Sequence, residues 1–351
     1  MAEQSFNSII NNLKAGEYAP VYFLYGEEPY FIDEIINYIE NNVIDEAIRD
    51  FNQTIVYGRD VTARQVVDLA TRFPMMGDKQ VVIVKEAQDL TANNRKLDDL
   101  EPYLSKPSES TILVLGYKYK KIDKRKTFYK KINKLPQIVI FESKKFYDNQ
   151  IPGWIKQYVV NQGYYIDDVS TQLLADHVGN DLGRLVNEVK KLFINLPESG
   201  KITTEIIEKY IGISKDFNIF EFTKALGFRD TFKAQQIVNY FEANQKNNPL
   251  PMITVMLYNY FVKIFLIHYY TKKNEPNIAA KIGLSPFFIR EYKAAAKNYP
   301  VPVVRKIIGE IKTLDLKSKG YGMVDGNNYG PLREFVYKCI HQKFPANITT
   351  E

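Results

Sequence analysis

The stretch VYFLYGEEPYFIDEIINYI, residues 21–39, has the pattern of a buried strand, a glycine turn at Gly26 and a helix. A phosphate-binding loop is built in this way, and it also carries a second glycine followed by Lys and by Ser or Thr. The corresponding positions here hold Phe31, Ile32 and Asp33. The sequence therefore predicts the architecture of such a loop without the groups that bind phosphate.

These three residues argue against a working nucleotide site. The missing lysine would supply a cation to the terminal phosphates, and the missing hydroxyl would hold magnesium. Ile32 and Asp33 remove that cation and add an anion, while Phe31 fills the place where the backbone must approach the ligand. We therefore predict a degenerate ATP site; the simpler alternative is an ordinary strand, turn and helix.

Strand and helix patterns alternate around this stretch, and we predict an α/β domain over residues 1–145. A helix is predicted at 62–73, because Val66, Leu69, Ala70 and Phe73 recur at helical spacing. Short apolar runs predict the strands of a parallel sheet with helices on both faces. These runs are residues 21–26, 80–86, 110–117 and 137–142.

Beyond this domain the chain shows helical patterns only. We expect a small helical domain at 146–212, a helical bundle at 213–345 and a short tail at 346–351. The apolar segment 252–270 is nearly long enough to span a bilayer, but Asn259, Lys263 and His268 interrupt it. We interpret it as a buried bundle helix and predict no membrane association.

Composition places the chain among multi-domain globular proteins, with 351 residues, 45% of them hydrophobic and 25% charged. The single cysteine, Cys339, excludes an internal disulfide and a thiolate metal cage. The first residues lack the pattern of a secretory signal, so a cytoplasmic location is expected. The three histidines lie in no metal-binding or nucleophile motif, so no catalytic residue, metal or cofactor is predicted.

The order of these features resembles one protein family. Strand, helix, FPMMGDKQ, two strands, a basic segment, a small helical domain and a helical bundle follow one another. In this order the chain is similar to the delta subunit of the bacterial DNA polymerase III clamp loader, a member of the AAA+ superfamily without a working ATP site. The stretches that carry the resemblance are residues 21–39, ATRFPMMGDKQVVIVKEA, STILVLGYKYKKIDKRKTFYKKI, GNDLGRLVNEVKKL and LDLKSKG.

The resemblance implies a clamp-binding element. In that family the amino-terminal domain inserts an apolar pair from the end of a helix into a pocket of the ring-shaped sliding clamp. The pair here would be Met75 and Met76, preceded by Phe73 and Pro74. Family members commonly carry Phe or Leu at the pair, but Met is also apolar and adaptable. The alternative is that the two methionines pack into the core where the helix meets the next strand.

Two basic segments are candidate DNA contacts. The first runs from Lys118 to Lys134 and is predicted to be a helix with Phe128 and Ile132 facing inward. Its candidate phosphate contacts are Lys124, Arg125 and Lys126, and a solvated basic face is the alternative. The second segment offers Lys317, Lys319 and Tyr321, where an exposed aromatic ring beside cations could stack on a base. An ordinary turn residue is the alternative for Tyr321.

The resemblance also implies the remaining assignments. Arg184 matches the nucleotide-sensing arginine of active AAA+ proteins and would be vestigial. The chain would form a complex with ATP-hydrolysing loader subunits and a delta-prime subunit through its bundle. It would open the sliding clamp for primer-template DNA without performing chemistry itself. Two other classes stay open, an active AAA+ ATPase with an atypical loop and a stand-alone nucleic-acid-binding protein.

Overall fold

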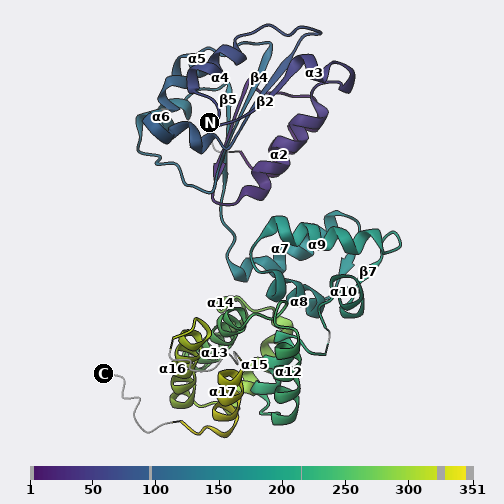
Figure 1. The fold of residues 1–351 in the computed structure, drawn as a ribbon, viewed down its shortest axis with the longest axis vertical. Helices are drawn as coiled ribbons and strands as arrows, with labels where there is room; N and C mark the ends of the chain where they lie inside the picture. The colour runs from purple at the N-terminus through teal and green to yellow at the C-terminus, as the bar shows by residue number, and fades with distance from the viewer. Residues whose placement is uncertain (1–3, 95–96, 215, 322–328, 345–351) are drawn as a thin grey trace. The chain divides into compact units, whose positions relative to one another are not determined.

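The computed structural model describes residues 4–94, 97–214, 216–321 and 329–344 (Figure 1). The chain divides into two compact units, residues 1–146 and 147–351. The second unit includes both the small helical domain and the bundle expected from the sequence, and the boundary between those two stays a prediction. The predicted tail, residues 346–351, lies outside the described residues.

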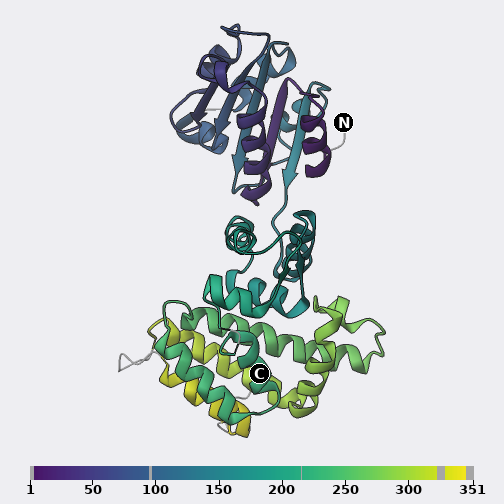
Figure 2. The same ribbon diagram turned by 90° about the vertical axis from the view of Figure 1, so that its right-hand side faces the viewer.

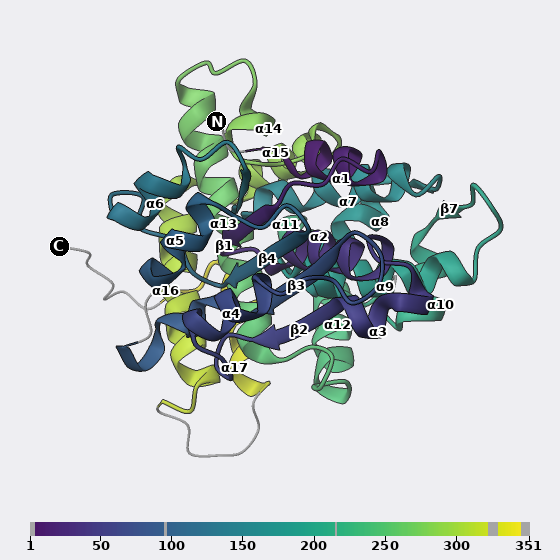
Figure 3. The ribbon, with the colours of Figure 1, turned by 90° about the horizontal axis from the view of Figure 1, so that it is seen from above.

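The first unit is built on a five-stranded parallel sheet with the strand order β2-β3-β4-β1-β5. Figure 3 shows β1, β4, β3 and β2 next to one another in this order. Four strands lie where the apolar runs predicted them, and β2 was not predicted. The strands are β1 (Val21–Gly26), β2 (Gln53–Tyr57), β3 (Gln80–Lys85), β4 (Thr111–Lys118) and β5 (Ile138–Ser143).

Helices cover both faces of this sheet, as a parallel sheet requires. Figure 1 shows α2 on one side of the strands and α4, α5 and α6 on the other. The face under α2 buries Tyr22, Leu24 and Ile83, whereas the opposite face buries Phe23, Val84 and Leu115. The helices are α1 (Phe6–Lys14), α2 (Pro29–Asn42), α3 (Arg49–Asn52), α4 (Ala63–Ala70), α5 (Glu101–Ser105) and α6 (Thr127–Ile132), with 3-10 turns η1 (Glu46–Ile48), η2 (Ala87–Asn94) and η3 (Leu97–Leu100).

The second unit begins with short helices and one small sheet. Its strands β6 (Tyr165–Ile166) and β7 (Lys201–Ile202) pair in parallel. Side-chain oxygens of Asp167 and Asp181 accept the backbone N–H groups at the starts of α8 and α9, which fixes where these helices begin. The helices are η4 (Asp148–Gln150), α7 (Ile151–Asn161), α8 (Asp168–Val178), α9 (Leu182–Ile194) and α10 (Thr204–Ile211).

A bundle of longer helices completes the second unit (Figure 2). Its central member, α13 (Leu250–Lys272), is long and apolar enough to cross a membrane by those two criteria alone. In the bundle, α13 contributes Leu257, Phe261 and Ile264 to the core and contacts α15 and α16, as predicted for a bundle helix. The other helices are α11 (Ile219–Gly227), α12 (Thr231–Ala243), α14 (Ile278–Lys281), η5 (Pro286–Phe288), α15 (Ile289–Asn298), α16 (Val301–Ser318) and α17 (Gly330–His341).

The helix predicted at 118–134 is wrong over most of its length. Strand β4 continues through Lys118, and the helix α6 spans only Thr127–Ile132. Asp123 explains the late start, because its carboxylate accepts the N–H of Arg125 and its carbonyl accepts that of Lys126 in a turn. Phe128 and Ile132 are buried as predicted.

The helix predicted at 62–73 is also shorter than expected. It ends at Ala70, and Phe73 lies beyond it with 85% of its surface exposed. The apolar spacing that placed Phe73 on the inner side of this helix was therefore misleading. Residues 71–79 instead form an irregular loop between α4 and β3, which we call the tip loop.

Candidate functional site

The tip loop presents large apolar side chains to solvent. Phe73, Met75 and Met76 are 85%, 77% and 49% exposed, respectively. The core-packing alternative for the two methionines is wrong, because neither side chain is buried. Apolar residues gathered on one exposed loop are a feature of surfaces that bind another protein.

One buried amide holds the centre of the tip loop in place. Asn52, at the end of α3, is 2% exposed. Its Oδ1 accepts hydrogen bonds from the backbone N–H of Met75 at 2.9 Å and of Met76 at 3.1 Å. Its Nδ2 donates to the carbonyl of Met76. The backbone of both methionines is thereby fixed while their side chains stay in solvent.

A second amide fixes the start of the tip loop. Gln80, the first residue of β3, donates from Nε2 to the carbonyl of Arg72 and, at 2.8 Å, to the hydroxyl of Thr111 on β4. Thr111 in turn donates to the carbonyl of Ala70 at 2.8 Å. The loop is thus ordered before any partner arrives, which reduces the entropy lost on binding.

In the stretch at residues 21–39, Gly26 is required by packing. Its φ of +148° lies outside the range that side-chain-bearing residues adopt readily. A Cβ built at this position would lie 1.9 Å from the carbonyl oxygen of Ser143, the last residue of β5. The close approach of two strand ends, both within the sheet, therefore accounts for this glycine without a bound phosphate.

The amino terminus of α2 is occupied by the chain's own carboxylate. Glu28, which is 5% exposed, accepts the backbone N–H of Tyr30 through Oε1 at 3.0 Å. A phosphate would use the same kind of N–H donor and the same positive end of the helix dipole. Ile32 is fully buried, and the ring of Phe31 lies 4.9 Å from that of Phe6, so neither side chain faces a ligand space.

Asp33 belongs to a three-membered ionic cluster. The Nζ of Lys118 lies 2.9 Å from a carboxylate oxygen of Asp33 and 2.9 Å from one of Glu86. Burial works to lower the pKa of Lys118, but the hydrogen bonds and charges of the two carboxylates outweigh it, so its pKa is raised. This cluster ties β4 to α2 and to the end of β3, and it pairs the charge of Asp33 within the fold.

The first basic segment is less free than its sequence suggested. Lys124 lies 3.1 Å from the carboxylate of Glu142, and Arg125 lies 3.0 Å from that of Asp123. Lys126 is exposed at the start of α6. Two of the three candidate phosphate contacts are therefore already engaged in ion pairs, each with an acidic residue of the same unit.

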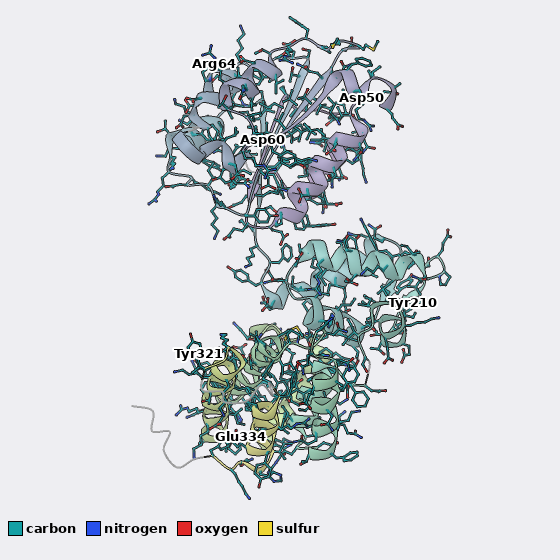
Figure 4. All side chains as sticks on the ribbon, viewed as in Figure 1. Asp50, Asp60, Arg64, Tyr210, Tyr321 and Glu334 are labelled. Carbon is teal, nitrogen blue, oxygen red and sulfur yellow. The ribbon has the colours of Figure 1, made fainter. Side chains whose placement is uncertain are left out.

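The remaining candidates lie on α9 and at the end of α16, in the second unit. Arg184 is exposed on the first turn of α9. Lys317 and Lys319, at the end of α16, pair with Glu334 at 3.4 Å and with Asp315 at 2.6 Å. Tyr321 is 69% exposed next to them and is labelled in Figure 4. Residues 322–328, which continue this segment, lie outside the described residues.

Sequence reasoning missed the residues that support the tip loop and the start of α2. Asn52 and Gln80 are polar residues beside strand starts, and Glu28 is one of two adjacent glutamates. The two amides act through contacts with residues distant in sequence. Asn52 contacts residues 23 and 24 positions further along the chain, and Gln80 contacts a residue 31 positions further along. Only the capping position of Glu28, just before Pro29 and the helix, could have been recognised locally.

Comparison with known proteins agrees with this geometry. The sequence model of the family described as "DNA polymerase III, delta subunit" matches residues 22–143. DNA polymerase III subunit delta of Bacillus subtilis (strain 168) is 26% identical over 316 residues, covering 88% of this chain and 90% of the relative. The solved structure of the Bacillus subtilis DNA clamp loader delta protein has the same fold, with a TM-score of 0.56 and 24% identity over 96% of this chain and 100% of that one.

The class of the protein follows from the fold and from these matches. The predicted fold, a parallel α/β unit followed by helical parts, is confirmed, and the chain shares it with the clamp loader delta protein. The family resemblance is confirmed as well: residues 22–143 match the family model of the DNA polymerase III delta subunit, and most of the chain is similar to a curated delta subunit.

Proposed function

We propose that this chain binds and opens the ring-shaped sliding clamp, so that the clamp can be loaded on primed DNA during replication. The observation that carries the proposal is the tip loop, where Phe73, Pro74, Met75 and Met76 stand on a backbone fixed by Asn52. An ordered, exposed apolar tip suits insertion into a pocket of another protein.

The chain itself performs no chemistry in this proposal. The carboxylate of Glu28 occupies the helix terminus where a phosphate would bind, and Asp33 is held by Lys118. Both features disfavour the active ATPase alternative. ATP would be hydrolysed by neighbouring loader subunits, and the chain would act as a non-catalytic member of a cytoplasmic DNA-directed DNA polymerase complex, a nucleotidyltransferase.

The proposed partners are the sliding clamp, the loader ATPase subunits, a delta-prime subunit and, through the complex, primer-template DNA. The residues 213–345 would form the collar through which the subunits assemble, and 146–212 would be the lid domain. Lys126 would contact phosphates directly. Lys124 and Arg125 would do so after exchanging their acidic partners for phosphates. Lys317, Lys319 and Tyr321 form a second candidate DNA contact, and Arg184 would be a vestigial sensor.

The test is binding of the purified chain to its cognate clamp without ATP. Burying a methionine contributes about 1.5–3 kcal/mol, so replacing Met75 and Met76 by Ser should weaken the complex by at least about 100-fold. The melting temperature should stay unchanged, because both side chains are exposed. Calorimetric titration measures the affinity and a thermal melt measures the stability.

A matched control uses Ile194→Ser, which removes a side chain that is 83% exposed in the second unit. This variant should bind the clamp as the unmodified chain does. Wild-type affinity in the Met75→Ser/Met76→Ser variant, or no clamp complex with the unmodified chain, would contradict the proposal.

A further inference from the structure

Strand β2 forms an edge of the sheet that its own sequence does not protect. It pairs with β3 on one side and ends the strand order on the other. Its residues, QTIVY, include no charge and no proline, which are the usual means of keeping an edge strand from pairing with another chain. The opposite edge differs, because the N–H of Gln4 donates to the carbonyl of Ile140 on β5 at 3.1 Å.

On its outer side, β2 is paired with no other strand in the part of the chain that the structure describes. At its start, Gln53 donates back to the carbonyl of Arg49. From Thr54 to Tyr57 the strand pairs with β3, and the carbonyl of Tyr57 also accepts the N–H of Asp60 at 2.9 Å in the turn that follows, so the open groups lie around Ile55. Open N–H and C=O groups in a row can accept an extended segment of a partner.

Large apolar side chains accompany this open edge. Phe51, Ile55 and Tyr57 are 54%, 37% and 46% exposed, and we call them the β2 strip. Ile55 lies opposite Ile83 in the register, on the face that α2 covers over the central strands. Helix α2 does not extend over β2, so the apolar face of the sheet is exposed to solvent at this edge.

The β2 strip is joined to the tip loop. Asn52, which holds the backbone of Met75 and Met76, is the residue directly after Phe51. On the other side of the loop, the Cδ1 of Ile48 lies 3.5 Å from the position of a Cβ built on Gly77. Figure 4 labels Asp50 in this segment. Strand β2 extends for about 13 Å from Gln53 to Tyr57, at about 3.3 Å a residue, and Phe51 lies just before it in α3.

We infer that the β2 strip is a second contact for the sliding clamp, next to the tip loop and part of one docking surface. A specific interface covers about 800 Å² on each partner, with about 20–30 residues. The few residues of the tip loop supply only a part of that area, and the apolar surface continuous with them is the β2 strip. The clamp would place an apolar or extended segment along β2 while the tip loop fills its pocket.

This inference rests on the proposed clamp binding, and the experiment separates the two. Full-length chain and purified clamp are titrated without ATP, using three variants beside the unmodified protein. The strip variant is Phe51→Ser/Ile55→Thr/Tyr57→Thr, the tip variant is Met75→Ser/Met76→Ser, and the control is Ile194→Ser. Threonine keeps a residue that suits a strand. We expect the strip variant to bind the clamp about 10- to 100-fold more weakly with its tip loop intact.

The inference would be overturned if the strip variant bound the clamp within about twofold of the wild-type affinity while the tip variant lost binding. The proposed function would then still stand. Failure of the unmodified chain to bind would overturn both. A strip variant that bound the clamp normally but no longer assembled with purified loader subunits would assign β2 to a neighbouring subunit and also overturn the inference. If the triple variant did not fold, the single variant Tyr57→Thr would decide by the same measure.

Discussion

At the level of one residue, packing explains why position 26 is a glycine. A side chain there would meet the backbone of Ser143 and would have to adopt a φ of +148°. We predict that Gly26→Ala lowers the free energy of unfolding by at least about 2 kcal/mol, because neither strand end can move without breaking the sheet. Urea unfolding measures this loss.

The control for this variant is Gly153→Ala. Gly153 lies inside α7, and nothing lies within 4 Å of a Cβ built there. Alanine suits a helix better than glycine, so this variant should be neutral or more stable by up to about 1 kcal/mol. Equal stability of Gly26→Ala and the unmodified chain would show that Gly26 is not required by packing.

Asp176 is a half-buried carboxylate of α8 that makes stability depend on pH. Burial raises its pKa to about 6, the hydrogen bond from Gln172 and the charge of Lys263 work against this rise, and Asp148 adds to it. With Lys263 it lines a cavity of about 500 Å³. Because the folded pKa is above the unfolded one, the stabilising contribution is complete below about pH 4 and is lost as the pH rises through 6.

We therefore predict that Asp176→Asn gains stability relative to the unmodified chain as the pH rises. The difference in unfolding free energy between the two should grow by up to about 3 kcal/mol from pH 4 to pH 8, since one pKa unit corresponds to about 1.36 kcal/mol. The amide oxygen can still accept the hydrogen bond from Gln172. Urea unfolding at both pH values measures the difference, and the exposed Asp50→Asn serves as the control. A difference that did not change with pH would contradict this account.

At the scale of elements, the tip loop depends on a residue that the partner need not touch. Removing the side chain of Asn52 leaves Phe73 and both methionines present but releases the backbone of Met75 and Met76. We predict that Asn52→Ala weakens clamp binding by about 10-fold and lowers the free energy of unfolding by about 1–3 kcal/mol, because buried hydrogen bonds are lost.

Asn52→Asp is the graded comparison for this prediction. A carboxylate keeps the acceptor for the N–H groups of Met75 and Met76 but loses the donor to the carbonyl of Met76. Its clamp affinity should lie between those of the unmodified chain and Asn52→Ala. Calorimetric titration with the clamp orders the three proteins, and full affinity in a folded Asn52→Ala would show that the loop needs no support.

Elements differed in how well the sequence predicted them. The central strands β1, β3 and β4 are buried, and the edge strand β5 is also mostly buried. Their apolar runs therefore stand out, and all four were predicted. Strand β2 is an edge strand of five residues that begins with Gln53 and Thr54, so it carries no such run. The basic segment was misjudged for another reason: charge pattern alone does not show that Lys118 is buried between two carboxylates.

The residues of the candidate site also differed in how well the sequence predicted them. The tip residues could be selected because their place in an ordered series of motifs resembled a family. The Asn52 and Gln80 contacts and the β2 strip could not be selected, since they depend on which distant segments the sheet brings together. Capping and turn residues can be predicted from the local sequence. Support of a loop by a buried amide cannot, because it depends on tertiary contacts.

At the scale of the whole molecule, the proposed docking surface belongs to one unit alone. The tip loop, Asn52, Gln80 and the β2 strip all lie in residues 1–146, which form a compact unit with a buried core on each face of the sheet. Residues 147–351 have a separate bundle core. We therefore expect that the first unit can bind the clamp without the second unit, through which the subunits would assemble.

We predict that a fragment of residues 1–146 folds by itself and binds the clamp with an affinity within about 10-fold of the full chain, while a fragment of residues 147–351 does not bind. The first fragment retains Phe146, whose ring lies 5.9 Å from that of Phe31. Circular dichroism establishes that each fragment is folded, and titration with the clamp measures binding. Met75→Ser/Met76→Ser in the short fragment should abolish its binding. A folded fragment 1–146 without affinity for the clamp would place essential contacts in the second unit and contradict a docking surface confined to the first.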